Sequence, residues 1–134
     1  MSGGRVTTDI ISRADCAGDP STVWRALLRA AHVDPGGRTG TLPHADLRVR
    51  SLSPGVGLRG RARWGDVRYR VTAYLVPHDE RTRLLLVAAV DLASAPSRAA
   101  VLRNSRRLAT QDLRELSVAT AAEAERSVEL RESA

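Results

Sequence analysis

The stretch RGRARWGDVRYRVTAYLV, residues 59–76, most constrains what this chain can fold into. Arginine occupies every second position from Arg59 to Arg63 and returns at Arg68 and Arg70, with small or apolar residues between. Side chains of a β-strand point alternately to opposite faces of a sheet, so this period of two predicts two strands. Gly65-Asp66 is a tight-turn signal between them. The stretch therefore predicts an antiparallel hairpin with one arginine face and one apolar face.

Three further segments have strand patterns. Residues 5–15 are rich in β-branched residues, and residues 45–53 alternate apolar residues with arginine. Residues 84–91, LLLVAAVD, form a nearly continuous apolar run, which is typical of a strand covered on both faces. Residues 34–43 are rich in Gly and Pro and are interpreted as a connecting loop. The chain thus predicts an N-terminal strand followed by a meander of about four antiparallel strands.

Two helices are expected beside this sheet. Asp19-Pro20 combines a good N-cap with proline at the first helical position, and apolar residues at helical spacing then continue to about Ala31. From Pro96 to about Glu125 the chain has no Gly or Pro and consists mostly of strong helix formers, which predicts one helix of ~30 residues, or ~45 Å. Residues 126–134 are polar and are expected to fray.

These elements define the expected fold class and domain organisation. A chain of 134 residues fits one domain, which we place at residues 1–125. The apolar face of the sheet needs a cover, and the C-terminal helix is the longest element available for it. We therefore expect an α+β fold in which a curved antiparallel sheet grips a long C-terminal helix, with a short helix after the first strand.

Composition narrows the classes of function. All 21 basic residues are arginine, an excess that a GC-rich coding bias explains in part, so the net charge of +6 is weak evidence for nucleic-acid binding. Cys16 is the single cysteine, which excludes an internal disulfide framework and a multi-cysteine zinc site. Without an apolar run of ~20 residues or the apolar core of a signal peptide, the sequence predicts a cytoplasmic protein that does not enter membranes.

Three segments carry a family resemblance: AGDPSTVWRAL at 17–27, VRYRVTAYLVPHDERTRLLLVAAVD at 67–91, and the arginine- and leucine-rich final helix. Their order and motifs resemble the START-like, or SRPBCC, superfamily, which includes polyketide cyclases and lipid-transfer domains. In typical members a second helix stands where this chain has residues 34–43, so the chain resembles a shortened member. The resemblance implies a hydrophobic cavity between the sheet and the long helix.

Candidate site residues come from this implied cavity and from the strand and helix patterns. Asp112 falls on the buried stripe of the long helix, where a carboxylate would be a candidate base for enolisation. Tyr69 offers a phenol on the apolar face of the sheet, and His44 lies near the expected mouth of the cavity. These three are the predicted catalytic residues. The predicted ligand-binding residues are Trp64, Val71, Ala73, Leu86, Leu102, Ser105, Ala109 and Leu116. No metal ligand set and no cofactor motif is found.

Three functions stay open at this level. The first is a cyclase or accessory enzyme acting on a polyketide-like or lipid-like molecule in specialised metabolism. The second is a non-catalytic carrier or self-resistance protein on the same fold. The third is a nucleic-acid or ribosome-associated module, against which the scarcity of aromatic residues among the arginines argues. The expected partners are a hydrophobic small molecule and, because the sheet has open edges, a second copy of the chain.

Overall fold

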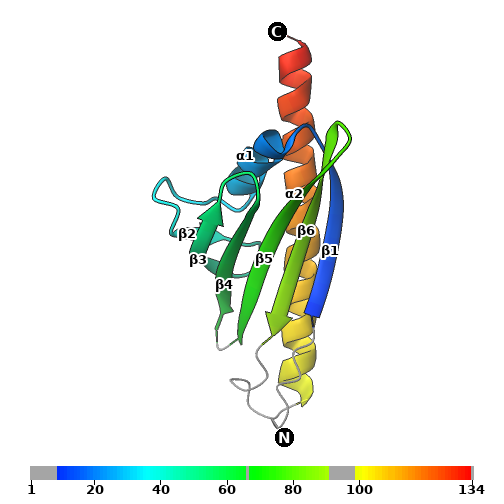
Figure 1. The fold of residues 1–134 in the computed structure, drawn as a ribbon. Coiled ribbons are helices and arrows are strands. Elements are labelled where there is room, and N and C mark those ends of the chain that lie inside the picture. The colour runs from blue at the N-terminus through cyan, green and yellow to red at the C-terminus, as the bar shows by residue number, and fades with distance from the viewer. Residues whose placement is uncertain (1–8, 66, 91–98, 134) are drawn as a thin grey trace, which may run out of the picture.

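The computed structural model describes residues 9–65, 67–90 and 99–133, with the side chains of residues 9, 90, 99–102 and 104 left outside the description. The described elements are β1 (Asp9–Ala17), α1 (Pro20–Ala30), β2 (Thr39–Thr41), β3 (Asp46–Ser53), β4 (Gly57–Trp64), β5 (Val67–His78), β6 (Arg81–Val90) and α2 (Ala99–Glu132) (Figure 1). The predicted fold class is confirmed: one open antiparallel sheet lies against a long C-terminal helix, and a short helix follows the first strand.

The sheet has six strands in the order β1-β6-β5-β4-β3-β2, and every neighbouring pair is antiparallel. Strands β2 to β6 form a meander of successive hairpin connections, and β1 pairs with β6 from the start of the chain (Figure 1). β1 and β2 are therefore the two edges. The homodimer expected from these edges stays a prediction.

The alternation of residues 59–76 is seen directly in the sheet. Leu58 and Ala62 of β4 are buried, and Val71 and Ala73 of β5 are buried on the same face, whereas the intervening arginines are exposed. α2 packs over this inner face along β1 and β6, and α1 packs beside α2 (Figure 1). Aliphatic side chains from the sheet and both helices form one core, as expected for a chain without Phe. No described helix is long and apolar enough to span a bilayer.

The glycine-rich connection contains a strand that the sequence did not predict. β2 occupies Thr39–Thr41 and pairs with β3, so the expected sheet of about five strands has six. Gly40 at its centre is buried, and a Cβ at this position would lie 2.7 Å from the carbonyl oxygen of Ala31. Glycine at this position lets β2 approach the end of α1. The sequence did not predict this strand because a segment rich in Gly and Pro is typical of a loop.

α2 continues beyond the point where the sequence predicts fraying. The helix reaches Glu132 rather than about Glu125. Contacts with α1 explain the difference: Nη2 of Arg29 donates to Oγ of Ser127 at 2.9 Å, and its Nε lies 3.2 Å from a carboxylate oxygen of Glu123. Tertiary packing thus stabilises a polar helix end that weak local patterning does not reveal.

The prediction that the last strand is covered on both faces is wrong. Leu84, Leu86 and Ala88 are fully buried on the inner face, but the outward-facing Leu85 and Val87 are only partly buried. No described helix covers the outer face (Figure 1). Cross-strand neighbours on β5 shield these side chains laterally, so an apolar run arises without a second layer.

Candidate functional site

The carboxylate of Asp112 is the centre of the candidate site. It lies on the inward stripe of α2, between Ala109 and Leu116, and its side chain is 0% exposed. Among the side chains that the structure describes, it is the one buried residue of a charged type. A carboxylate held away from water is costly unless hydrogen bonds compensate it, so its partners define the site.

Three donors engage the two oxygens of Asp112. The backbone N–H of His44 donates to Oδ1 at 3.0 Å, and Nδ1 of the same residue lies 2.7 Å from Oδ1. The hydroxyl of Tyr69 donates to Oδ2 at 2.6 Å. The three residues that the sequence proposes as catalytic, each from a different element, therefore meet in one hydrogen-bonded cluster. Their chemical roles stay predictions.

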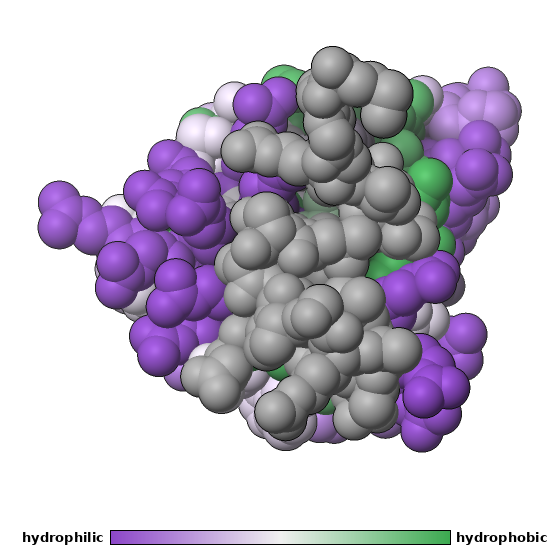
Figure 2. Space-filling view, turned by 90° about the horizontal axis from the view of Figure 1, so that it is seen from below, coloured by the Kyte–Doolittle hydropathy of each residue, from purple (hydrophilic) through white to green (hydrophobic). Residues whose placement is uncertain are grey.

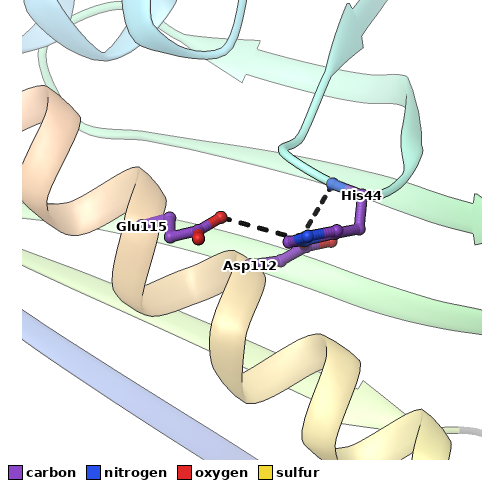
Figure 3. A group of neighbouring side chains, drawn as sticks. All are labelled: His44, Asp112 and Glu115. Atoms are coloured by element: carbon purple, nitrogen blue, oxygen red, sulfur yellow. Dashed lines mark hydrogen bonds and ion pairs between the residues drawn. The ribbon is translucent and has the colours of Figure 1, made fainter.

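The loop between β2 and β3 positions His44. Leu42 and Ala45 are buried on either side of it, and the backbone N–H of Leu42 donates to the carbonyl of Ala45 at 2.8 Å. His44 is exposed, and its ring lies against Asp112 of α2 (Figure 3). Two contacts to one carboxylate oxygen then hold both the backbone and the ring of His44.

Tyr69 is built to remain a proton donor. Its side chain is buried on β5. Burial, followed by the hydrogen bond and the charge of Asp112, raises the pKa of its phenol well above its usual range. The hydroxyl therefore keeps its proton at neutral pH and orients Asp112, which favours a positioning role for this residue.

The ring of His44 has one nitrogen engaged and one available. With the carboxylate as acceptor, Nδ1 carries the proton in the neutral ring, and Nε2 is then the basic nitrogen. No residue in the described part of the chain hydrogen-bonds Nε2, and 37% of the side chain is exposed. An imidazole oriented by a buried carboxylate can accept a proton at Nε2 and return it, which is general acid–base chemistry.

Glu115 is the neighbour that the sequence did not identify. It lies one turn after Asp112 on α2, and one of its carboxylate oxygens is 3.8 Å from Nδ1 of His44 (Figure 3). The signal that could have found it is the i, i+3 spacing of two acidic residues on one helix.

Together these residues present one nitrogen and two carboxylate groups whose atoms lie within 4.8 Å of one another, a set that could hold a metal ion. The hydrogen bond between His44 and Asp112 occupies the same nitrogen, so a cation would have to displace it.

Most of the predicted ligand-binding residues face the interior. Val71, Ala73, Leu86, Ala109 and Leu116 belong to the buried core between sheet and helix. Their contact with a ligand stays a prediction.

The other three differ in their placement. Ser105 is also buried on α2, whereas Leu102 lies outside the described side chains. The alternating pattern of β4 predicts an inward-facing Trp64, but this residue is 50% exposed at the end of the strand. The alternation places it on the inner side of the sheet, but there the strand ends beyond the packed core.

Comparisons with known proteins agree on the architecture. No protein-family model matches the sequence, and a search of curated proteins finds no match. Among solved structures, the di-domain ARO/CYC StfQ from the steffimycin biosynthetic pathway is similar with a TM-score of 0.65 and 13% identity over 91% of this chain and 52% of that chain. The protein MLL2253 from Mesorhizobium loti is similar with a TM-score of 0.64 and 17% identity over 89% of this chain and 98% of that chain.

A third similar structure is DynU16, a protein of the dynemicin biosynthetic locus, with a TM-score of 0.57 and 12% identity over 81% of this chain and 45% of that chain. This chain thus spans about half the length of StfQ and of DynU16. At these identities the similarity is one of fold. The chain has the helix-grip fold of START-like proteins, as its sequence motifs predict.

Proposed function

We propose that this protein binds a hydrophobic small molecule with several carbonyl groups between the sheet and α2, and promotes its ring closure. The observation that carries the proposal is the fully buried carboxylate of Asp112, whose Oδ1 accepts hydrogen bonds from the backbone and the ring of one histidine. Such a carboxylate orients the imidazole and stabilises the imidazolium that forms when Nε2 takes a proton.

The chemistry would run through His44. Nε2 removes a proton from a carbon between two carbonyl groups, and the electron pair of the broken C–H bond forms an enolate. The enolate carbon attacks a second carbonyl of the same molecule, a C–C bond forms, and the resulting alkoxide takes the proton back from Nε2. No oxidant or further reactant is consumed. General acid–base assistance of this kind contributes about 10²–10⁴-fold to a rate.

Two other observations support this class of ligand. The buried core between the sheet and the helices is mostly aliphatic, Tyr69 and Asp112 are among its polar residues, and the exposed His44 lies beside them. This combination of an apolar wall with a few convergent polar groups is typical of small-molecule sites. In addition, StfQ, which has the same fold, is a di-domain ARO/CYC from the steffimycin biosynthetic pathway.

The matched pair His44→Gln and His78→Gln tests the proposal with a synthetic 1,3,5,7-tetraketone as the substrate, in which the carbon between the first two carbonyl groups can close a six-membered ring on the last carbonyl. His78 is exposed at the end of β5, so its variant controls for the loss of an imidazole. The rate of cyclisation is measured by chromatography and ultraviolet absorbance. We expect this rate to fall at least about 100-fold in His44→Gln and to stay unchanged in His78→Gln. Equal turnover in both variants would show that His44 is not the acid–base residue.

The carrier function is the second candidate. It is favoured by the complete engagement of Asp112, because a closed hydrogen-bond cluster can serve stability alone. Binding of the tetraketone without turnover, measured by quenching of tryptophan fluorescence, would support the carrier over the cyclase.

A further inference from the structure

The outer face of the sheet carries an uncompensated group of arginines, on the side opposite to the His44 site. Strand register places Arg61 of β4 directly across from Arg70 of β5 and, on its other side, from Arg48 of β3. Arg63 and Arg68 form a second directly opposed pair. Like charges in such positions destabilise a sheet, so this arrangement is held at a cost to stability.

Asp46 of β3 lies directly across from Arg63, but none of the arginines of this face forms an ion pair with an acidic residue that the structure describes. Elsewhere in the described chain three arginines form ion pairs: Arg29 and Arg126 with Glu123, and Arg81 with Asp15 at 3.0 Å. None of the described residues forms an ion pair or a hydrogen bond with the guanidinium group of Arg61 or Arg70. The same is true of their neighbours on this face, Arg48, Arg50, Arg59 and Arg68. The hydrophilic residues at the left of Figure 2 lie on the side of the molecule formed by β2 to β4.

A hollow of about 500 Å³ opens among these side chains. Its rim consists of Arg50, Arg59, Arg61 and Arg70, and its other lining includes Thr72, Tyr74, Val87 and Ala89. This volume is in the range of sites for small organic molecules, about 300–1,000 Å³.

The β-bulge in β3 contributes to the rim. The pairing of β3 with β4 shifts between Val49 and Ser51, which leaves Arg50 as the extra residue of the bulge. Its exposed side chain joins three arginines of the neighbouring strands at one hollow. Bulges commonly redirect a side chain next to a functional site.

We propose that this hollow binds a small organic polyphosphate, of which a nucleoside triphosphate is the simplest representative. Guanidinium groups match phosphate oxygens with two parallel hydrogen bonds, and four of them surround the hollow. The organic part lies against Tyr74 and Val87, since both residues line the hollow and Tyr74 is 41% exposed. The site is separate from the His44 cluster, and it does not depend on the function proposed above.

Two other occupants fit this face less well. A second copy docked through the same face would bring its arginines against these arginines. Single-stranded nucleic acid would need several aromatic side chains for stacking, and Tyr74 is the one aromatic residue among the described residues of this face.

The experiment compares two arginine pairs on the same two strands. Arg61→Gln/Arg70→Gln removes a directly opposed pair at the hollow, and Arg63→Gln/Arg68→Gln removes a directly opposed pair that does not line it. Both double variants lose the same charge. Binding of magnesium-free ATP is measured by isothermal titration calorimetry at 50 and 150 mM salt, with adenosine and inorganic tripolyphosphate as the two partial ligands.

We expect ATP to bind more tightly than tripolyphosphate, and adenosine to bind weakly or not at all. The affinity for ATP should fall at least about tenfold in the Arg61/Arg70 variant and at most about threefold in the Arg63/Arg68 variant. Because both substitutions relieve like-charge repulsion, the Arg61/Arg70 variant should keep or raise its melting temperature, and Arg61→Gln alone provides a milder variant.

Four results would overturn the proposal. The first is no binding of ATP to the unaltered protein at 50 mM salt. The second is an equal loss in both variants, which would mean a general electrostatic attraction. The third is equal affinity for ATP and tripolyphosphate, which would show that the organic part of the ligand does not contribute to binding. Binding of generic RNA that is tighter than that of ATP would assign the face to nucleic acid instead.

Discussion

Replacement of Tyr69 by Phe is the sharpest test of the buried cluster. The change removes one hydroxyl and keeps the ring that packs in the core between sheet and helix. Oδ2 of Asp112 then loses its donor at 2.6 Å in a place where the carboxylate is 0% exposed. A hydrogen bond to a charged group contributes about 1.5–3 kcal/mol, and a buried acceptor left unsatisfied costs a similar amount. We therefore expect a loss of about 2–3 kcal/mol in the free energy of unfolding.

Chemical denaturation in urea at pH 7 measures this loss, with Tyr74→Phe as the matched control. Tyr74 is the other tyrosine of the chain, it is 41% exposed on the outer face, and no described residue hydrogen-bonds its hydroxyl. Its replacement should change the free energy of unfolding by less than about 0.5 kcal/mol. The reasoning would be refuted if Tyr69→Phe were no more destabilising than Tyr74→Phe.

Alkaline pH provides a second readout that a packing defect would not produce. The pKa of Tyr69 is raised in the folded protein, so above pH 10 the unfolded chain releases this proton and the folded chain keeps it. The folded state then binds more protons, and stability falls by up to about 1.4 kcal/mol per pH unit from this residue alone. Tyr69→Phe removes this contribution, so its stability difference from the unaltered protein should narrow above pH 10.

Three further predictions follow from single positions. Cys16 is fully buried, and burial with the nearby charge of Asp15 raises the pKa of its thiol to about 11, so a thiol reagent at pH 8 should modify it in urea but not in the folded protein. Gly40→Ala places a Cβ 2.7 Å from a backbone carbonyl oxygen and should cost about 1–3 kcal/mol in thermal unfolding, whereas Gly36→Ala meets nothing nearer than 3.6 Å and should be close to neutral. Asp19→Ala removes the N-cap whose carboxylate accepts from the N–H of Thr22 at 2.8 Å, and circular dichroism melts should show a loss of about 1 kcal/mol.

The sequence predicted the architecture well where the pattern is local. The alternation of residues 59–76 sets which side chains point inward, because the pleat of a strand leaves no other choice. The capped first helix and the long run free of Gly and Pro likewise follow from backbone preferences within a few residues. Local patterns did not predict strand β2, the full length of α2 or the partial exposure of the outer face of β6. At these places contacts with distant elements determine the structure.

The site shows the same division. The sequence alone identified Asp112, Tyr69 and His44 as polar residues on inward or entrance positions, and it determined that the arginines share one face. It could not show that His44 and Asp112, 68 positions apart, share two hydrogen bonds, because helix rotation and loop placement depend on the whole core. Nor could it show that the arginines of three strands surround one hollow, since strand register and a bulge bring them together. Only the tertiary structure decides which residues of different elements come within hydrogen-bond distance.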